Sequence, residues 1–402
     1  MAHWTLERDS LIVFVMRVKQ LQLTLENFMI NRFRGSLVGA IVGDCLGGMH
    51  ESSGSVHTFA EVASKSDPLS LRSKLIRAGD RHVFRYSSDS LAIIAASESI
   101  LAYDKVSYDK LRSDFQRRLV ESLRHRSGSV HSLSSSMAIS ELSDSLSRSE
   151  SFEASKYDLQ GNCGLVRGIP CGLSDPLLAP ILAGSTHSHV SATEGAKLLG
   201  ELVHWLVHKF PGSQSDLFNK YPNGIISRLQ KAALLAEEVF QKDTAEDSTE
   251  FQEIFSRRIG TGAGANVALA SGWFGYQCAL IGEGRHVNTP SVPAHLPAIK
   301  ADQRSVNLYG NSNRLDSERA FERESPFFQK ESHIGNAINW AVSLGGDTRS
   351  NACIAGALAG AHWGMMEIPD IWLTFCEGVP IAIQLADKLA LKADIESSRI
   401  IT

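Results

Sequence analysis

The apolar residues of this chain recur mostly at helical spacing. Leu, Ala and Gly dominate the apolar segments, and alternating runs of β-branched residues are scarce. Apolar positions that recur about every 3.6 residues favour amphipathic helices. The segments with such a helical pattern are 91–101, 192–207, 227–240, 354–363 and 380–391. No repeat of fixed period is apparent, and the pattern predicts an all-α chain.

Two polar segments break this pattern. The stretch 127–155 is crowded with serine, but Met137, Ile139 and Leu142 fit one edge of a helix, which predicts a polar helix with loops. The stretch 301–332 gathers Arg, Asp, Glu and Asn. An irregular segment of that length is either a functional loop or a disordered insertion. Neither segment is interpreted as a linker, because the motifs on both sides are expected to build one site.

Residues 1–28 are expected to form an N-terminal helical extension. Their apolar run, 11–16, is too short to span a bilayer, and the acidic Glu7 and Asp9 before it do not fit a signal peptide. Residues 29–402 are then expected to form a single domain that carries the polar insertion at 301–332.

Composition narrows the classes of molecule that the protein is expected to bind and the cell compartment in which it is expected. The 402 residues include 40 Lys+Arg and 44 Asp+Glu, which gives a net charge of −4, so no basic excess indicates direct binding to nucleic acid or to a membrane surface. The six cysteines form no Cys-x-x-Cys pair, which is typical of reduced thiols inside the cell. A cytoplasmic or nuclear monomer is expected, with a mitochondrial address left open.

The first stretch with candidate chemistry runs from Gly35 to Glu51. Small residues at Gly35, Gly39 and Gly43 let a helix approach its neighbours closely. Asp44 and Glu51 are seven residues apart, which is two turns on one face if the helix continues that far. The stretch is either part of a site or a tightly packed core helix with surface acids.

Two further stretches place hydroxyls and carboxylates where helices are expected to begin. Ser-Ser-Asp-Ser at 87–90 precedes one helical segment, and Gly-Gly-Asp-Thr-Arg-Ser at 345–350 precedes another. Ser and Asp are favoured N-cap residues because their oxygens accept a hydrogen bond from an unpaired backbone N–H. The same oxygens are also ligands of hard cations. Each stretch alone fits a cap, whereas three oxygen-rich stretches together favour a cation site.

Two glycine-rich loops have the character of phosphate-binding loops. Gly161 and Asn162 lie in the first loop, 160–164, and the second loop spans 258–264. Exposed backbone N–H groups in such loops can cradle a diphosphate. His187 and His189 have no Cys or His partner at zinc spacing, which favours a hydrogen-bonding role or contact with a ligand.

Taken in order, these stretches resemble the ADP-ribosylglycohydrolase family, the all-α hydrolases that remove ADP-ribose from proteins and related acceptors. The resemblance covers roughly residues 32–391. Gly-Asp-Cys-Leu-Gly at 43–47, followed by Glu51, is most similar to the animal branch that acts on ADP-ribosyl-serine and poly(ADP-ribose). The family's closing motif, Gly-Gly-Asp-Thr-Asp-Thr, corresponds to 345–350. The resemblance implies a compact single-domain helical bundle.

The resemblance also implies a chemistry and a set of site residues. Two Mg²⁺ ions at the centre of the bundle hold the ribose hydroxyls and an activated water near the anomeric carbon, where an oxocarbenium-like state forms. By matching positions, Glu51 is the catalytic gating carboxylate, and the metal-ligand positions are Ser87, Asp89, Asp347 and Ser350. The ligand-binding positions are Gly161 and Asn162 for the phosphates, His187 for the distal ribose, and Gly260, Thr261 and Gly262 beside the adenosine.

Two positions depart from the family pattern. The family's middle motif is Thr-Asp-Asp-Thr, so Ser88 replaces a ligating aspartate with a neutral hydroxyl. Arg349 stands where a second aspartate is shared between the two metals, which replaces a negative charge with a positive one. At about 4 Å and an effective dielectric of about 20, each unit-charge interaction amounts to about 4 kcal/mol. These departures predict that one Mg²⁺ ion or none binds.

Two outcomes for the site remain open. The Arg349 guanidinium can occupy the metal site and pair with Asp89 and Asp347, which leaves an ADP-ribose-shaped pocket without normal catalysis. Alternatively, one metal stays on Asp89, Asp347 and Glu51 with reduced activity. The expected function is recognition of ADP-ribose or an ADP-ribosylated protein, with weakened Mg²⁺-dependent hydrolysis of the glycosidic bond. The alternative is an inactive ADP-ribose reader, or a structural protein that keeps only the fold.

Overall fold

The computed structural model describes most of the chain as helices. The described residues are 28–51, 59–67, 84–103, 105, 107–124, 133–148, 152, 154, 159, 161–208, 214–221, 223–241, 248–260, 264–285 and 332–400. Within these ranges there is no β-strand, only two isolated bridges, so the all-α prediction is confirmed. The predicted extension 1–28 and the insertion 301–332 lie outside the described residues, apart from Phe28 and Ser332.

The described residues form a succession of helices along the chain. One helix covers residues 28–47 and is called helix 28–47 below. The others are α2 (Phe59–Ser66), α4 (Ser88–Ala102), α5 (Tyr108–Arg124), α6 (Leu133–Arg148), α7 (Asn162–Leu165), α8 (Gly168–Gly172), α9 (Ala179–Gly184), α10 (Val190–His208), α11 (Gln214–Phe218), α12 (Asn223–Gln241), α13 (Ser248–Arg258), α14 (Ala265–Arg285), α16 (His333–Ser343), α17 (Thr348–Trp363), α18 (Asp370–Phe375) and α19 (Val379–Ile400). Two 3₁₀ turns, η3 (Pro176–Leu178) and η7 (Met365–Glu367), connect them.

The segments predicted from apolar spacing all lie inside helices. The five segments fall within α4, α10, α12, α17 and α19, and the serine-rich stretch contains α6. The apolar spacing therefore located these helices, although each extends beyond the segment that predicted it.

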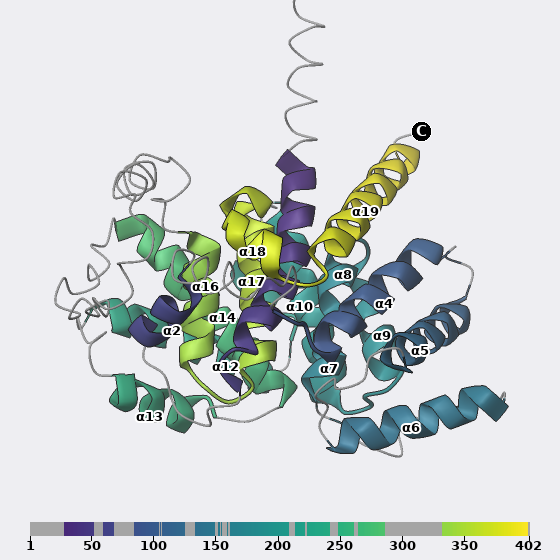
Figure 1. Cartoon of the computed structure of the whole chain (residues 1–402), viewed down its shortest axis with the longest axis horizontal. Helices are drawn as coiled ribbons and strands as arrows, with labels where there is room; N and C mark the ends of the chain where they lie inside the picture. Colours follow the sequence, from purple (N-terminus) through teal and green to yellow (C-terminus); the bar gives the residue numbers. More distant parts are fainter. Residues whose placement is uncertain are drawn as a thin grey trace, which may run out of the picture.

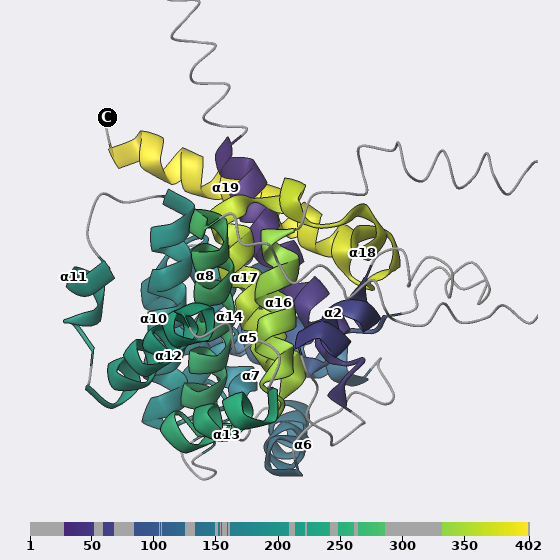
Figure 2. The same ribbon diagram turned by 90° about the vertical axis from the view of Figure 1, so that its left-hand side faces the viewer.

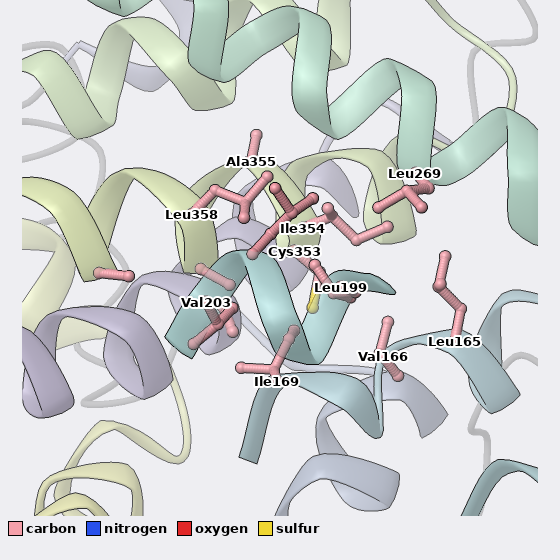
Figure 3. Close-up of a cluster of buried hydrophobic side chains, with 14 of the residues drawn as sticks. Leu165, Val166, Ile169, Leu199, Val203, Leu269, Cys353, Ile354, Ala355 and Leu358 are labelled. Carbon is pink, nitrogen blue, oxygen red and sulfur yellow. The ribbon is translucent and has the colours of Figure 1, made fainter. Parts of the chain in front are cut away.

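The centre of the bundle is a packed group of helices. α14, α16 and α17 pack against one another, α12 covers α14, and α10 connects this group to α7, α8 and α9. α6 and α19 lie at opposite ends of the bundle (Figures 1 and 2). The labelled side chains of Figure 3 show the seam where the segment through α7 and α8 meets α10, α14 and α17. Leu199, Leu269 and Ile354 in this seam are fully buried, and each contributes about 1.5–3 kcal/mol of burial free energy.

Helix 28–47 and α17 are in backbone contact along their length. An added Cβ on Gly39 would lie 2.2 Å from the carbonyl oxygen of Gly356, and one on Gly43 would lie 2.1 Å from that of Ala352. Because glycine has no side chain, the two helices approach more closely than any other residue would permit. The predicted close approach is confirmed, and the two helices lie side by side in the middle of the bundle (Figure 1).

No helix among the described residues has the length and apolar character needed to cross a membrane.

Candidate functional site

The three oxygen-rich stretches come together at one place in the fold. Helix 28–47 ends there with Asp44 in its last turn, and α4 and α17 both begin there. Ser87 is the N-cap of α4, and its hydroxyl accepts a hydrogen bond from the backbone N of Asp89 at 3.2 Å. Asp347 is the N-cap of α17. Both stretches are therefore helix caps and parts of one polar cluster, so the two interpretations do not exclude each other.

Asp44 is the buried centre of this cluster. Its side chain is 0% exposed, and Oδ2 accepts from the Ser87 backbone N at 2.8 Å, the Ser87 hydroxyl at 3.0 Å and the Ser90 hydroxyl at 2.6 Å. The interpretation of Asp44 as a surface acid is wrong. Its position could have been inferred from the sequence, because Leu37, Ile41 and Asp44 lie on one helix face and the first two are core residues.

Glu51 does not share a helix face with Asp44. Helix 28–47 ends at residue 47, and the chain turns through residues 48–50 before Glu51. The turn is fixed where Gly47 meets α17, because the Thr348 hydroxyl donates to the Gly47 carbonyl at 2.9 Å and an added Cβ on Gly47 would lie 2.4 Å from the Thr348 carbonyl oxygen. Glu51 is exposed at the rim of the cluster.

Asp89 is buried at the start of α4. It is 5% exposed, and its Oδ2 accepts a short hydrogen bond from the Ser350 hydroxyl. Burial, together with the negative charges of Asp347 and Asp44, raises the pKa of Asp89 to about 8. Ser88, the residue that departs from the family's aspartate, is also buried at this helix start.

Asp347 connects α17 to the first glycine-rich loop. Its Oδ1 accepts from the backbone N of Ser350 at 3.2 Å, and its Oδ2 accepts from the side-chain amide of Asn162 at 2.8 Å. Gly345 and Gly346 precede it with φ of +71° and +67°, a left-handed turn that other residues rarely adopt. The turn aims the Asp347 carboxylate at the loop that carries Asn162.

Arg349 fills the space between helix 28–47 and Glu51. Its Nε donates to Glu51 Oε2 at 2.5 Å, and its Nη1 donates to Asp44 Oδ1 at 3.2 Å and to the carbonyl oxygens of Asp44 and Arg85. The expectation that Arg349 pairs with Asp89 and Asp347 is wrong. The N-cap geometry directs the side chain of the second helical residue back toward helix 28–47, where Asp44 and Glu51 provide the negative charge.

The guanidinium lies directly against Gly48. An added Cβ on Gly48 would lie 2.3 Å from Cζ of Arg349, so a side chain at this position would displace the guanidinium. Burial lowers the pKa of Arg349, but the Asp44 and Glu51 carboxylates outweigh burial and raise the pKa above its ordinary value. The side chain is therefore a permanent cation that contacts two carboxylates.

Three of the predicted ligand-binding positions, Gly161, Asn162 and His187, lie at α7, next to the cluster. Gly161 forms an isolated antiparallel bridge with Gly264, which brings the two glycine-rich loops together. Asn162 is 4% exposed, and its Oδ1 is buried with no hydrogen-bond partner among the described residues. Gly260 lies at the start of the second loop with φ +107°. Thr261 and Gly262 lie outside the described residues.

His187 is the remaining predicted site residue, and the fold places it against α7. It is 2% exposed, and an added Cβ on Gly164 would lie 2.9 Å from Cγ of its ring. The carboxylate cluster thus lies next to a second group of predicted positions at α7, and the hydrogen bond between Asn162 and Asp347 joins the two groups.

Among the described residues, no group of three or more His, Cys, Asp or Glu side chains is arranged to hold a metal ion.

Comparison with known proteins places the whole chain in a family context. The sequence profile of the ADP-ribosylglycohydrolase family matches residues 25–398. ADP-ribosylhydrolase ARH3 of Danio rerio is 25% identical over 390 residues, covering 90% of each chain. ADP-ribosylhydrolase ARH3 of Homo sapiens is 23% identical over 380 residues, covering 90% of this chain and 93% of its own. A solved ADP-ribosylglycohydrolase-related protein complex matches with a TM-score of 0.51 and 19% identity, covering 91% of this chain and 99% of that chain, which supports the fold.

Proposed function

The chain belongs to the ADP-ribosylglycohydrolase family, and on that ground we propose that it recognises ADP-ribose, free or attached to a protein, with hydrolysis of the glycosidic bond strongly weakened. The relatives that it resembles over most of its length are ADP-ribosylhydrolases by name. Gly161, Asn162 and His187 lie close to one another at α7, and this proximity supports the proposal that the chain recognises a ligand there.

The carboxylates of this site do not fit a pair of divalent cations. The resemblance implies two Mg²⁺ ions, which need oxygen ligands that point at the metal. Here Asp44 Oδ1 and Glu51 Oε2 accept from Arg349, and both oxygens of Asp347 accept from N–H groups. A divalent cation near these oxygens would also face the positive charge of Arg349, at a cost of several kcal/mol (about 4 per unit charge at 4 Å).

The observation that carries this proposal is the contact between Arg349 and Glu51. Glu51 is the position that the resemblance assigns to the gating carboxylate, which must be free to move between the metal and the scissile oxygen. Its Oε2 lies 2.5 Å from Nε of Arg349, a charge-assisted hydrogen bond. While this contact holds, Oε2 of Glu51 is occupied by Arg349, and the side chain is not free to move toward a metal or toward the scissile oxygen.

What remains at the site is a set of groups that bind and orient a ligand. The buried Oδ1 of Asn162 accepts a hydroxyl or an N–H, and its orientation is fixed because its Nδ2 donates to Asp347, which only accepts. Backbone N–H groups of the loop at Gly161 are suited to phosphate oxygens. Arg349 adds a fixed positive charge where the family has a metal.

The proposal is tested by titrating the chain with ADP-ribose by calorimetry, once with Mg²⁺ and once with a chelator. We expect binding of similar affinity in both conditions and little or no release of ADP-ribose from an ADP-ribosyl-serine peptide. Binding that requires Mg²⁺, together with turnover that is lost in Asp347→Ala, would instead identify an active enzyme with one remaining metal. Failure to bind in either condition would identify a protein that keeps only the fold.

A reversion experiment isolates the two departures from the family. We expect Arg349→Asp combined with Ser88→Asp to gain Mg²⁺ binding and measurable hydrolysis, because it restores both carboxylates. The control is Arg34→Asp, which makes the same charge change as Arg349→Asp alone, in a half-exposed ion pair with Asp387 outside the site. If the double variant gains neither metal binding nor hydrolysis, these two residues do not account for the loss.

A further inference from the structure

A chain of buried hydrogen bonds ends at the His187 ring. Arg167 Nη2 donates to the Thr186 hydroxyl at 2.7 Å, and the same hydroxyl lies 2.7 Å from Nδ1 of His187. The three residues are 0%, 1% and 2% exposed, so water does not compete for these contacts. The three residues of this hydrogen-bonded series belong to neither the carboxylate cluster nor the glycine-rich loops.

Arg167 is fixed from several sides. Its Nη1 donates to the Leu182 carbonyl at 2.7 Å and to the Ser185 hydroxyl at 3.3 Å. The guanidinium carbon lies 4.6 Å above the centroid of the Phe115 ring. A guanidinium has only donors, so the contact between Arg167 and Thr186 has one possible direction. The Thr186 oxygen must accept from Arg167.

This direction fixes the hydroxyl proton of Thr186. A buried hydroxyl proton without an acceptor costs free energy, and the acceptor that the geometry offers is Nδ1 of His187. Nδ1 must then be unprotonated. Burial and the nearby charge of Arg167 lower the pKa of His187 to about 3, so the ring is neutral at pH 7 and carries its single proton on Nε2.

The Nε2–H group is left with no partner in the described part of the protein. Nε2 is buried and makes no hydrogen bond there, although the ring packs against Gly164 of α7. Buried donors are normally satisfied. An unsatisfied buried donor beside α7, where Gly161 and Asn162 also lie, therefore points to a group that the ligand brings.

We propose that Thr186, held by Arg167, is a positioning residue that keeps His187 as an N–H donor, so that the ligand must present an acceptor oxygen to Nε2. This inference rests on the proposed function and adds a requirement for the ligand, which must carry a hydrogen-bond acceptor at this place. A hydroxyl, ether or phosphate oxygen of the ligand satisfies Nε2–H, whereas an amine or amide N–H in the same place is rejected. Arg167 acts through Thr186 and does not touch the ligand.

The test compares Thr186→Val with Thr186→Ser. Valine has the shape of threonine without the hydroxyl, and serine keeps the hydroxyl. Two quantities are measured: the nitrogen chemical shifts of the His187 ring by NMR, assigned with His187→Gln, and the Kd of ADP-ribose. We expect the wild type and Thr186→Ser to hold the Nε2–H tautomer, with Kd values within about threefold of each other. In Thr186→Val we expect a mixture of tautomers and a Kd raised about tenfold.

The tautomer measurement needs no ligand, which separates this inference from the proposed function. A wild-type ring protonated on Nδ1 overturns the role of Thr186, and this result is available even if Thr186→Val does not fold. A Thr186→Val chain that keeps a pure Nε2–H ring overturns it as well. Absence of ADP-ribose binding in the wild type, with the Nε2–H tautomer present, would overturn the proposed function and the ligand rule while the assignment of Thr186 stands.

Discussion

Asp44 illustrates how a single buried charge organises this site. Its Oδ2 gathers donors from the first turn of α4, and its Oδ1 accepts from Arg349 on α17. An ion pair buried to this extent is stabilising only when the other oxygen is also satisfied, and here it is. The carboxylate thus joins three helices through hydrogen bonds and one ion pair.

Replacing Asp44 should destabilise the fold far more than replacing a carboxylate at the surface. In Asp44→Asn, the amide NH₂ must face either the serine donors or the guanidinium, and both are donors. We expect a loss of about 2–4 kcal/mol in the free energy of unfolding by urea. The control Asp387→Asn removes a contact of 2.6 Å to Arg34, but with side chains 41% and 37% exposed, and should cost less than about 1 kcal/mol. Equal losses would contradict the central role of Asp44.

His187 should make the fold sensitive to acid. Its pKa is lowered to about 3 in the folded chain, whereas the unfolded side chain titrates near 6.5. Between these two pKa values, His187 binds a proton in the unfolded state but not in the folded state. The free energy of unfolding therefore falls as the pH falls below about 6.5. Lowering the pH from 7 to 5 should cost the wild type about 2 kcal/mol more than it costs His187→Gln, as measured by urea unfolding at both pH values. The same pH dependence in both chains would exclude His187 as its source.

At the scale of elements, the sequence predicts the helices well and their contacts only in part. Apolar spacing locates α10 and α12 because a buried face repeats with the helical period. The glycine positions of helix 28–47 indicate that something approaches closely, but spacing within one helix cannot reveal that the partner is α17. The partners predicted for Arg349 were wrong for the same reason, because the spacing of residues along the chain does not show which helices meet. The carboxylates that it meets were within reach only because helix 28–47 ends at residue 47 and turns back.

The contact between helix 28–47 and α17 should be intolerant of a single methyl group. In Gly39→Ala the new Cβ would lie 2.2 Å from the Gly356 carbonyl oxygen, and backbone cannot move aside cheaply. We expect a loss of about 3 kcal/mol or more, or failure to fold. The matched control is Gly282→Ala in α14, where no atom lies within 4 Å of the new Cβ. This variant should gain about 0.5–1 kcal/mol from helix propensity, as measured by thermal unfolding. A neutral Gly39→Ala would show that the two helices are not in backbone contact.

At the scale of the whole molecule, the net charge of −4 conceals a site with strong local charges of both signs. Asp44, Asp89 and Asp347 lie around the cluster, and Arg349 supplies positive charge from within the protein. The resemblance to the family's motifs predicted two departures, at Ser88 and Arg349, because each differs from the motif residue expected there. It could not predict which carboxylates the guanidinium contacts, since that depends on folded geometry.

Ligand binding should stabilise the whole chain without metal. ADP-ribose at about 100 times its Kd should stabilise the folded state by about 2.7 kcal/mol, which raises the melting temperature by several degrees. We expect the same shift in Mg²⁺ and in a chelator for the wild type. The Arg349→Asp, Ser88→Asp chain should show a larger shift in Mg²⁺ than in the chelator. A wild-type shift that disappears with the chelator would contradict recognition without metal.

The distance along the chain between Asp44 and Arg349 limits when their contact can form during synthesis. Their contact joins residues 305 positions apart, and the Thr348 contact to Gly47 joins residues 301 apart. Chains are synthesised from the N-terminus at about 5–20 residues per second. Arg349 is therefore added at least about 15 seconds after Asp44, and the ion pair cannot form before then. Contacts this distant also slow the search for the native state. Until α17 emerges, helix 28–47 exposes an apolar glycine-lined face, and nascent chains stalled before residue 348 should be the form of this protein that chaperones retain.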